Sequence, residues 1–200
     1  MKPLAVDLFC GLGGWAEGFL AEGYDVIGVD NDPRFAAGYE ALGAHFILAD
    51  VRDLDGRDFR AARCIVASPP CNEFTRLNFL RSHAPPPDMS LVETCWRIQG
   101  EARVPFVLEN VEGARRYIGP AVAHRGSWYL WGDVPILFDG HMPPKVGGTP
   151  RRSNPWVPRG DGTRPSRLYQ WGHRDKGWDG AALRAKIPLP LARAVARGFL

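Results

Sequence analysis

One cysteine in a proline-rich turn is the residue of this sequence best suited to nucleophilic chemistry. Cys71 lies in the stretch Ser68-Pro69-Pro70-Cys71-Asn72-Glu73-Phe74-Thr75, directly after the apolar run Cys64–Ala67, which predicts a buried strand. Two successive prolines cannot continue a strand ladder, so the chain must turn outward at the edge of the sheet. A buried structural cysteine is the alternative. The prolines and the polar Asn72-Glu73 favour a nucleophile that faces a pocket.

A carboxyl group follows a second apolar run. Pro105–Leu108 predicts a strand, and Glu109-Asn110-Val111 comes directly after it. A glutamate at a strand tip is solvated in most proteins. The carboxyl ends of parallel strands, however, meet at one edge of a sheet. We therefore expect Glu109 and Cys71 to face a common pocket.

The first fifty residues have the pattern of a nucleotide-type cofactor site. A predicted strand, Leu4–Phe9, leads into the glycine-rich turn Cys10–Gly14. A second predicted strand, Asp25–Val29, ends at Asp30, about 20 residues after the turn, where a carboxylate can bind ribose hydroxyls. Asp50 follows the third strand and could accept a hydrogen bond from an adenine amino group. No GxxxxGK phosphate loop is present.

Alternating helices and strands predict an α/β fold, with a mostly parallel sheet and helices on both faces. We expect a polar stretch containing Pro85-Pro86-Pro87 to form a mobile loop over the site. The further predicted elements are helices at Trp15–Glu22, Arg34–Leu42, Asp88–Arg103 and Leu191–Phe199, and strands at Ala44–Leu48 and Trp128–Gly132.

Length and composition narrow the function classes. Two hundred residues form one domain, or one domain with a small appendage. No run of about 18 apolar residues predicts a membrane helix, and Asp7 comes too early for a signal peptide. The four cysteines have no CxxC spacing, which argues against a zinc site and against a disulfide framework. We expect a cytoplasmic, metal-free protein with free thiols.

Charge is distributed unevenly along the chain. Residues 139–200 contain twelve lysines and arginines against four aspartates and no glutamate, whereas the net charge of the whole chain is only +3. The first 138 residues are therefore acidic overall. A basic C-terminal third predicts contact with a polyanion, although an ordinary solvated surface has the same composition.

The motifs taken together resemble the cytosine-C5 DNA methyltransferases, which use S-adenosylmethionine. Asp7–Gly14 is similar to the family's first motif, and Asp30 and Asp50 occupy the places of its ribose-binding and adenine-binding acids. Pro69-Pro70-Cys71 resembles the nucleophile motif, and Glu109-Asn110-Val111 the proton-donor motif. The order and spacing agree over roughly the first 115 residues. The resemblance implies a Rossmann-like methyltransferase fold and cofactor contacts from Phe9, Gly11, Leu12, Gly13, Gly14, Asp30, Asn31, Asp50, Val51 and Pro70.

The resemblance also implies a mechanism. A Cys71 thiolate adds to C6 of cytosine, so that C5 becomes nucleophilic enough to take the methyl group. Glu109 holds N3, a role that a raised carboxyl pKa would favour, and Arg125 bonds the O2 carbonyl. Because C6 is out of reach inside a duplex, the cytosine must be flipped out or single-stranded. The sequence does not identify the base that removes the C5 proton.

The chain departs from the family pattern downstream. Of the usual Gln-x-Arg-x-Arg motif only Arg125 remains, and the final motif lacks its asparagine before Ile187-Pro188-Leu189-Pro190. Between Phe138 and about Asp179 lies a very short counterpart of a target-recognition region. Its basic and aromatic residues suit phosphate contact and base stacking. The candidate nucleic-acid contacts are Arg76, Arg151, Arg152, Arg159, Arg164, Arg167, Trp156 and Trp171.

The expected organisation is a catalytic core at 1–138, a minimal recognition region at 139–180 and a helix at 181–200 that completes the core. We expect a monomer acting on double-stranded DNA with a flipped cytosine, or on single-stranded nucleic acid, in a restriction-modification or phage setting. Thr75-Arg76 is a mild sign of the first alternative, a tRNA cytosine-C5 methyltransferase. A non-catalytic nucleic-acid-binding relative is the second.

Overall fold

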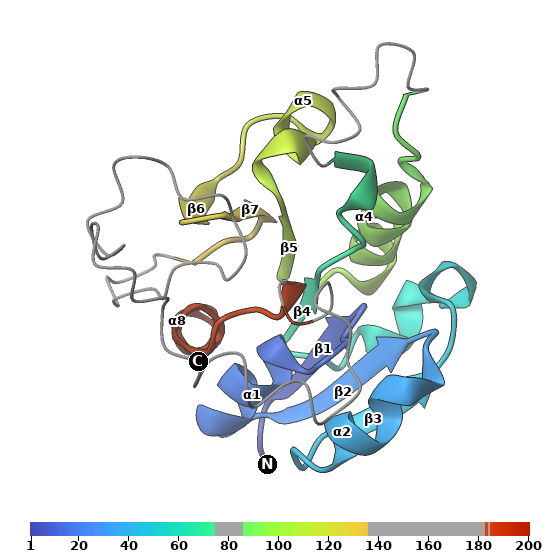
Figure 1. Ribbon diagram of the computed structural model, residues 1–200. Helices are drawn as coiled ribbons and strands as arrows, with labels where there is room; N and C mark the ends of the chain where they lie inside the picture. Colours follow the sequence, from blue (N-terminus) through green and yellow to red (C-terminus); the bar gives the residue numbers. More distant parts are fainter. Residues whose placement is uncertain (75–85, 136–182, 184) are drawn as a thin grey trace, which may run out of the picture.

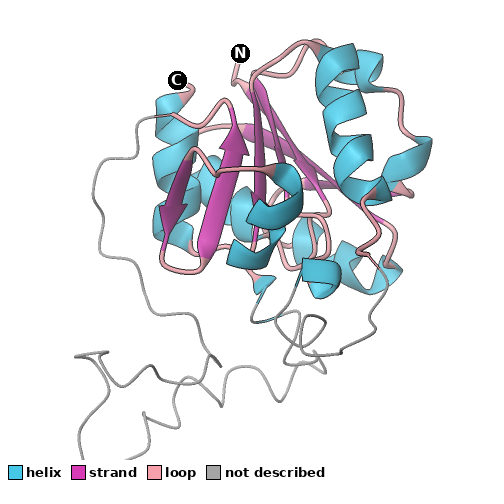
Figure 2. Ribbon diagram, turned by 90° about the horizontal axis from the view of Figure 1, so that it is seen from above, coloured by secondary structure: helices cyan, strands magenta, loops and turns pink. Residues whose placement is uncertain are grey.

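The computed structural model describes residues 1–74, 86–135, 183 and 185–200, which form one mixed sheet with helices on both faces (Figures 1 and 2). The order of the seven strands is β3-β2-β1-β4-β5-β7-β6. The strands are β1 (Leu4–Leu8), β2 (Asp25–Asp30), β3 (His45–Leu48), β4 (Cys64–Ala67), β5 (Phe106–Asn110), β6 (Ala123–Arg125) and β7 (Trp128–Gly132). The predicted α/β fold is confirmed.

Strand direction brings distant parts of the chain to one edge. Strands β1 to β5 are parallel to one another, whereas β7 is antiparallel both to β5 and to β6. The carboxyl ends of β1, β2, β4 and β5 therefore share an edge with the turn of the β6–β7 hairpin. Loops at this edge of an open α/β sheet are where ligands bind.

Each face of the sheet is covered by its own set of helices. The α-helices are α1 (Gly14–Ala21), α2 (Ala36–Glu40), α4 (Ser90–Ala102), α5 (Arg115–Ile118) and α8 (Leu189–Gly198). Short 3-10 helices are η1 (Pro33–Phe35), η2 (Val51–Asp53), η3 (Gly56–Phe59), η4 (Asn72–Phe74) and η5 (Glu112–Ala114). Helices α1 and α8 bury their apolar sides on one face, and α4 covers the other. Among the residues that the structure describes, no helix is long and apolar enough to span a membrane.

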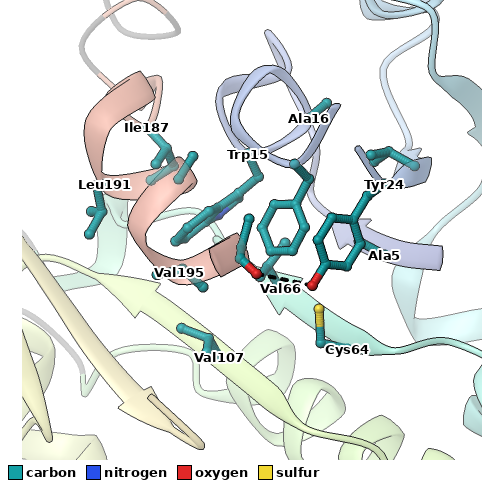
Figure 3. Close-up of a cluster of buried hydrophobic side chains, with 14 of the residues drawn as sticks. Ala5, Trp15, Ala16, Tyr24, Cys64, Val66, Val107, Ile187, Leu191 and Val195 are labelled. Carbon is teal, nitrogen blue, oxygen red and sulfur yellow. Dashed lines mark hydrogen bonds between the residues drawn. The ribbon is translucent and has the colours of Figure 1, made fainter. Parts of the chain in front are cut away.

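The C-terminal helix α8 is an integral part of the core. Its buried Leu191 and Val195 pack with Trp15 of α1 and with sheet residues such as Val66 (Figure 3). The hydroxyl group of Tyr24 donates a hydrogen bond of 3.0 Å to the carbonyl oxygen of Ala196 in α8. The predicted C-terminal helix thus packs in the same core as α1, which lies near the start of the sequence.

Helices α1 and α8 approach closely at a glycine. A Cβ atom on Gly18 would lie 2.2 Å from the Cβ of Ala192. We predict that Gly18→Ala lowers the free energy of unfolding by about 1–3 kcal/mol, because overpacking forces the helices apart. The matched control is Gly100→Ala in α4, where an added Cβ meets nothing within 4 Å. It should raise stability by about 0.5–1 kcal/mol through helix propensity. Thermal unfolding of both variants checks the opposite signs, and equal melting temperatures would contradict the packing.

Two sequence-based element boundaries need correction. The helix predicted at Arg34–Leu42 is the 3-10 helix η1 followed by α2, which ends at Glu40. The strand predicted at Pro105–Leu108 continues to Asn110, because Glu109 and Asn110 pair with Leu130 and Tyr129 of β7. Glu109, expected at the strand tip, therefore lies within the strand.

Several predictions fall outside the described residues. These are the proposed mobile loop as far as residue 85, the contact residue Arg76, and the recognition region 139–180 with its arginines and tryptophans. The predicted division into core, recognition region and C-terminal helix accordingly stays a prediction.

Candidate active site and cofactor-binding edge

The backbone of the turn after β1 enters the left-handed region at three residues. Phe9, Gly11 and Gly13 have φ angles of 59°, 48° and 73°. A Cβ on Gly13 would lie 2.5 Å from Leu42, and one on Gly14 would lie 2.5 Å from the backbone nitrogen of Ile187. At Gly11 the nearest atom to an added Cβ is 3.9 Å away. Packing thus accounts for Gly13 and Gly14, whereas the backbone at Gly11 is open to close approach.

Asp30 links this turn to the tip of β2. Its carboxylate accepts backbone hydrogen bonds from Gly11 and Asp32, each of 3.0 Å. Burial raises the pKa of the Asp30 carboxyl, and the two N–H donors oppose that shift. A carboxylate has about four acceptor positions, so Asp30 retains capacity for hydroxyl donors. The next residue, Asn31, is exposed at the same edge.

Asp50 and Val51 have structural partners of their own. The Asp50 carboxylate caps η2 through the backbone N–H of Arg52 and also pairs with the Arg52 guanidinium. These bonds to Arg52 lower the pKa of Asp50 to about 2. The Val51 side chain is buried in the core on the α4 side. Their contact with an adenine ring stays a prediction.

The loop that carries Cys71 is anchored by three elements. The Ser68 N–H donates to the carbonyl oxygen of Leu8 in β1 at 3.2 Å. The indole Nε1 of Trp15 in α1 donates to Ser68 Oγ at 2.9 Å. The side-chain nitrogen Nδ2 of Asn110 in β5 donates to the carbonyl oxygen of Pro69 at 3.0 Å. The loop before the nucleophile is therefore fixed to the strands and helix on either side.

Cys71 is the accessible cysteine of this chain. Cys10, Cys64 and Cys95 are buried, whereas Cys71 is partly exposed just before η4. Burial raises the pKa of the thiols of Cys64 and Cys95 to about 12, which makes them poor nucleophiles. Pro70, which precedes Cys71, is exposed as well.

Glu109 and Arg125 project from the same face of the sheet. Glu109 pairs with Leu130 in the β5–β7 ladder, and Arg125 pairs with Trp128 in the β6–β7 ladder. Leu130 and Trp128 are two residues apart, so both pairs share one face. Glu109 is only 7% exposed, and Arg125 ends β6 beside the hairpin turn at the cofactor edge. The topology thus brings the three predicted catalytic residues to one edge.

A family comparison fits this geometry. Residues 4–117, more than half of the chain, match the family model of the C-5 cytosine-specific DNA methylases. The chain belongs to this family. The matched segment contains β1 to β5, the glycine turn, the Cys71 loop and Glu109, and it ends just before the β6–β7 hairpin.

The individual relatives that the chain matches are larger. The Type II methylase M.HgiDII of Herpetosiphon aurantiacus is 35% identical over 84 residues, which are 38% of this chain and 24% of that protein. A solved E. coli protein, described as a DNA modification methyltransferase encoded within a prophage, is 22% identical with a TM-score of 0.47; the match covers 58% of this chain and 34% of that one. A mutant DNMT2 of Spodoptera frugiperda is 21% identical with a TM-score of 0.41, and the match covers 57% of this chain and 37% of that one. The chain thus spans between a quarter and about a third of these relatives.

S-adenosylmethionine, the methyl donor of this family, fits the residues present. The open backbone at Gly11 and the half-buried Asp30 carboxylate adjoin one another through their hydrogen bond. Donor groups on a ribose suit the remaining acceptor positions of Asp30. Phe9, Leu12 and Gly13 line the same turn, and their individual contacts stay predictions.

Sequence reasoning missed the contacts of four polar residues. Trp15 and Ser68 lie 53 positions apart, and no local pattern indicates their hydrogen bond. Asn110 was part of a recognised motif but had no assigned role. Asp7 is fully buried within β1, where Tyr39 donates to its Oδ2 at 3.1 Å. Burial raises the pKa of Asp7 to about 8. The sequence feature that could have indicated a buried carboxyl group is the charged residue within an otherwise apolar predicted strand.

We predict that the Trp15–Ser68 hydrogen bond supports methyl transfer more than folding. Trp15→Phe and Ser68→Ala each remove one partner, and a net hydrogen bond contributes about 0.5–1.5 kcal/mol. We expect kcat to fall about 3- to 10-fold in each variant, with KM for the nucleic acid little changed. The double variant should be no worse than the singles, because one interaction is lost in all three. Steady-state kinetics measure this, and fully multiplied losses in the double variant would contradict the coupling.

Proposed function

We propose that this chain transfers a methyl group from S-adenosylmethionine to C5 of cytosine in DNA, with Cys71 as the nucleophile. The observation that carries the proposal is the hydrogen bond from Asn110 Nδ2 to the carbonyl oxygen of Pro69. It ties the loop bearing Cys71 to the residue next to Glu109, in a chain of the C-5 cytosine-specific DNA methylase family. Nucleophile and buried carboxyl are thereby held at the edge where Asp30 and Gly11 lie.

The bound cofactor supplies an electrophilic sulfonium methyl group. The Cys71 thiolate attacks C6 of cytosine, and a carbon–sulfur bond forms while the C5–C6 double bond opens. Glu109 holds N3 and delivers a proton as charge moves into the ring, a role that suits a carboxyl group shielded from water. Arg125 donates to O2. The electron pair at C5 would then bond to the methyl carbon, and the pair of the broken methyl–sulfur bond would stay on the cofactor's sulfur, leaving S-adenosylhomocysteine.

Regeneration of the enzyme reverses the addition. A base removes the C5 proton, the C5–C6 double bond re-forms, and the sulfur atom of Cys71 leaves with the bonding pair. The Cys71 thiolate is restored and the N3 proton returns to Glu109, so no external oxidant or reductant is needed. Overall, the methyl group of the cofactor replaces the C5 proton of cytosine, and that proton leaves with the base.

We propose that the cytosine leaves the duplex before this chemistry. Extrusion of a base costs a few kcal/mol, and phosphate contacts by basic side chains would offset that cost. A monomer is the simplest acting form. The Type II name of M.HgiDII and the prophage description of the E. coli protein favour a restriction-modification or phage setting.

Nucleoside mass spectrometry tests this function. DNA and tRNA are purified from cells that lack cytosine methylation of their own and that express the chain or its Cys71→Ser variant. The expected result is 5-methylcytosine in DNA with the chain and none with the variant. Methylated cytosine in tRNA alone would assign the activity to RNA. Absence from both, with a folded protein that binds S-adenosylmethionine, would favour a non-catalytic nucleic-acid-binding role.

A further inference from the structure

A stack of cationic and aromatic side chains lies beside the candidate site. The guanidinium carbon Cζ of Arg115, at the start of α5, is 5.8 Å from the ring centroid of Tyr129 in β7. The His124 ring of β6 stacks on Tyr129, with centroids 4.9 Å apart and planes 15° from parallel. We call these three residues the Arg115–Tyr129–His124 stack.

The stack adjoins the nucleophile loop. Tyr129 pairs directly with Asn110 in the β5–β7 ladder, and Asn110 holds the carbonyl oxygen of Pro69. On the same side, the ring of Phe74, three residues after Cys71, is 5.9 Å from that of Tyr117 in α5. One continuous set of contacts thus runs from the loop of the nucleophile to the stack. The stack lies on the sheet face opposite to Glu109 and Arg125.

The chain segment that carries the stack is basic. Residues 113–129 contain three arginines and a histidine but no aspartate or glutamate. Arg115 and His124 are exposed, and Tyr129 is partly so. Among the described residues no carboxylate forms an ion pair with Arg115, whose guanidinium lies over the tyrosine ring. A cation–π contact at an exposed site contributes only about 0.5–1 kcal/mol, so the guanidinium keeps its hydrogen-bond donors for another partner.

We propose that the Arg115–Tyr129–His124 stack binds the DNA sugar–phosphate backbone next to the target cytosine. The proposal rests on the proposed function, since it places the substrate at the same edge. An arginine held against a tyrosine ring presents its planar fork in one orientation, which suits phosphate oxygens. Because such contacts carry no base information, they fix the register of the strand over Cys71 without specifying its sequence.

The test is the salt dependence of DNA binding by the full chain. Fluorescence anisotropy of a labelled cytosine-containing duplex is recorded between 50 and 200 mM KCl for wild type, Arg115→Gln and Arg115→Lys. Loss of one phosphate contact should make the slope of log K against log salt shallower by about 0.9 for Arg115→Gln, on every duplex sequence. Arg115→Lys, which keeps the charge, should restore the slope. His124→Gln should weaken binding less than Arg115→Gln.

Arg103→Gln is the matched control. Arg103 is exposed at the C-terminal end of α4, before β5 and thus at the opposite edge of the sheet. Arg103→Gln removes the same charge at that edge. If Arg103→Gln and Arg115→Gln made the salt slope of DNA binding shallower by the same amount, the proposal would be overturned. It would also fail if Arg115→Gln kept the wild-type slope, or if Arg115 mattered for tRNA and not for DNA.

Methylation of the same duplex separates the two proposals. If wild type methylates DNA while Arg115→Gln binds like wild type, the stack proposal fails and the function stands. If wild type binds DNA through Arg115 but leaves cytosine unmodified, the stack proposal stands and the function fails.

Discussion

Replacing Cys71 by serine is expected to abolish methyl transfer to cytosine, with a loss of at least about 10³-fold. A hydroxyl group is a far weaker nucleophile than a thiolate, and the C6 addition on which the later steps depend would not occur. Because Cys71 is partly exposed, the substitution should leave the melting temperature nearly unchanged. Transfer of labelled methyl groups to DNA measures the loss.

The control for Cys71 is a buried cysteine. Cys95 is fully buried in α4, so Cys95→Ala removes core packing without touching the site. This variant should melt at a lower temperature, yet retain methyl transfer per folded molecule at low temperature. Cys71→Ser should therefore lose activity and keep its stability, whereas Cys95→Ala should lose stability and keep its activity. A Cys71→Ser protein with near wild-type activity would contradict the assigned role.

Replacing Asp30 by alanine is expected to weaken S-adenosylmethionine binding roughly 10- to 100-fold. Hydrogen bonds to a charged group contribute about 1.5–3 kcal/mol, and each 1.4 kcal/mol is a factor of ten in affinity. The variant also loses the bond that Asp30 accepts from Gly11, so the turn itself should loosen. Isothermal titration calorimetry on the folded protein gives the affinity.

Asp25 provides a control from the same strand. It lies at the opposite end of β2, where its exposed carboxylate is 3.5 Å from Lys2. An exposed ion pair contributes little, so Asp25→Ala should leave both cofactor affinity and stability close to wild type. If Asp30→Ala bound S-adenosylmethionine as tightly as Asp25→Ala does, the ribose role would be wrong.

Much of the architecture could be predicted because it is written in local patterns. The prolines after Cys64–Ala67 placed Cys71 at a strand end, and apolar runs bounded by glycine or aspartate located β1, β2 and β3. Asp30 directly follows the second predicted strand, about 20 residues after the glycine turn, and this spacing indicated its place at the carboxyl edge of the sheet. Each of these inferences needs only neighbouring residues.

The rest depends on contacts between residues far apart in sequence. Glu109 was expected at the tip of its strand, and no local pattern shows that β7 pairs with it through Leu130. The bonds from Trp15 to Ser68 and from Asn110 to Pro69 likewise join segments 53 and 41 positions apart. Such anchors follow from tertiary packing, which alternation and propensity do not encode.

Covalent trapping tests the central claim most directly. The full chain is incubated with S-adenosylmethionine and a duplex in which 5-fluorocytosine replaces cytosine in one strand. Fluorine at C5 cannot leave as a proton does, so the release step is blocked and the carbon–sulfur bond persists. We predict a protein–DNA adduct that maps by peptide mass spectrometry to Cys71 and is absent from Cys71→Ser. Methylation of ordinary cytosine without any adduct, or an adduct on another residue, would contradict the account.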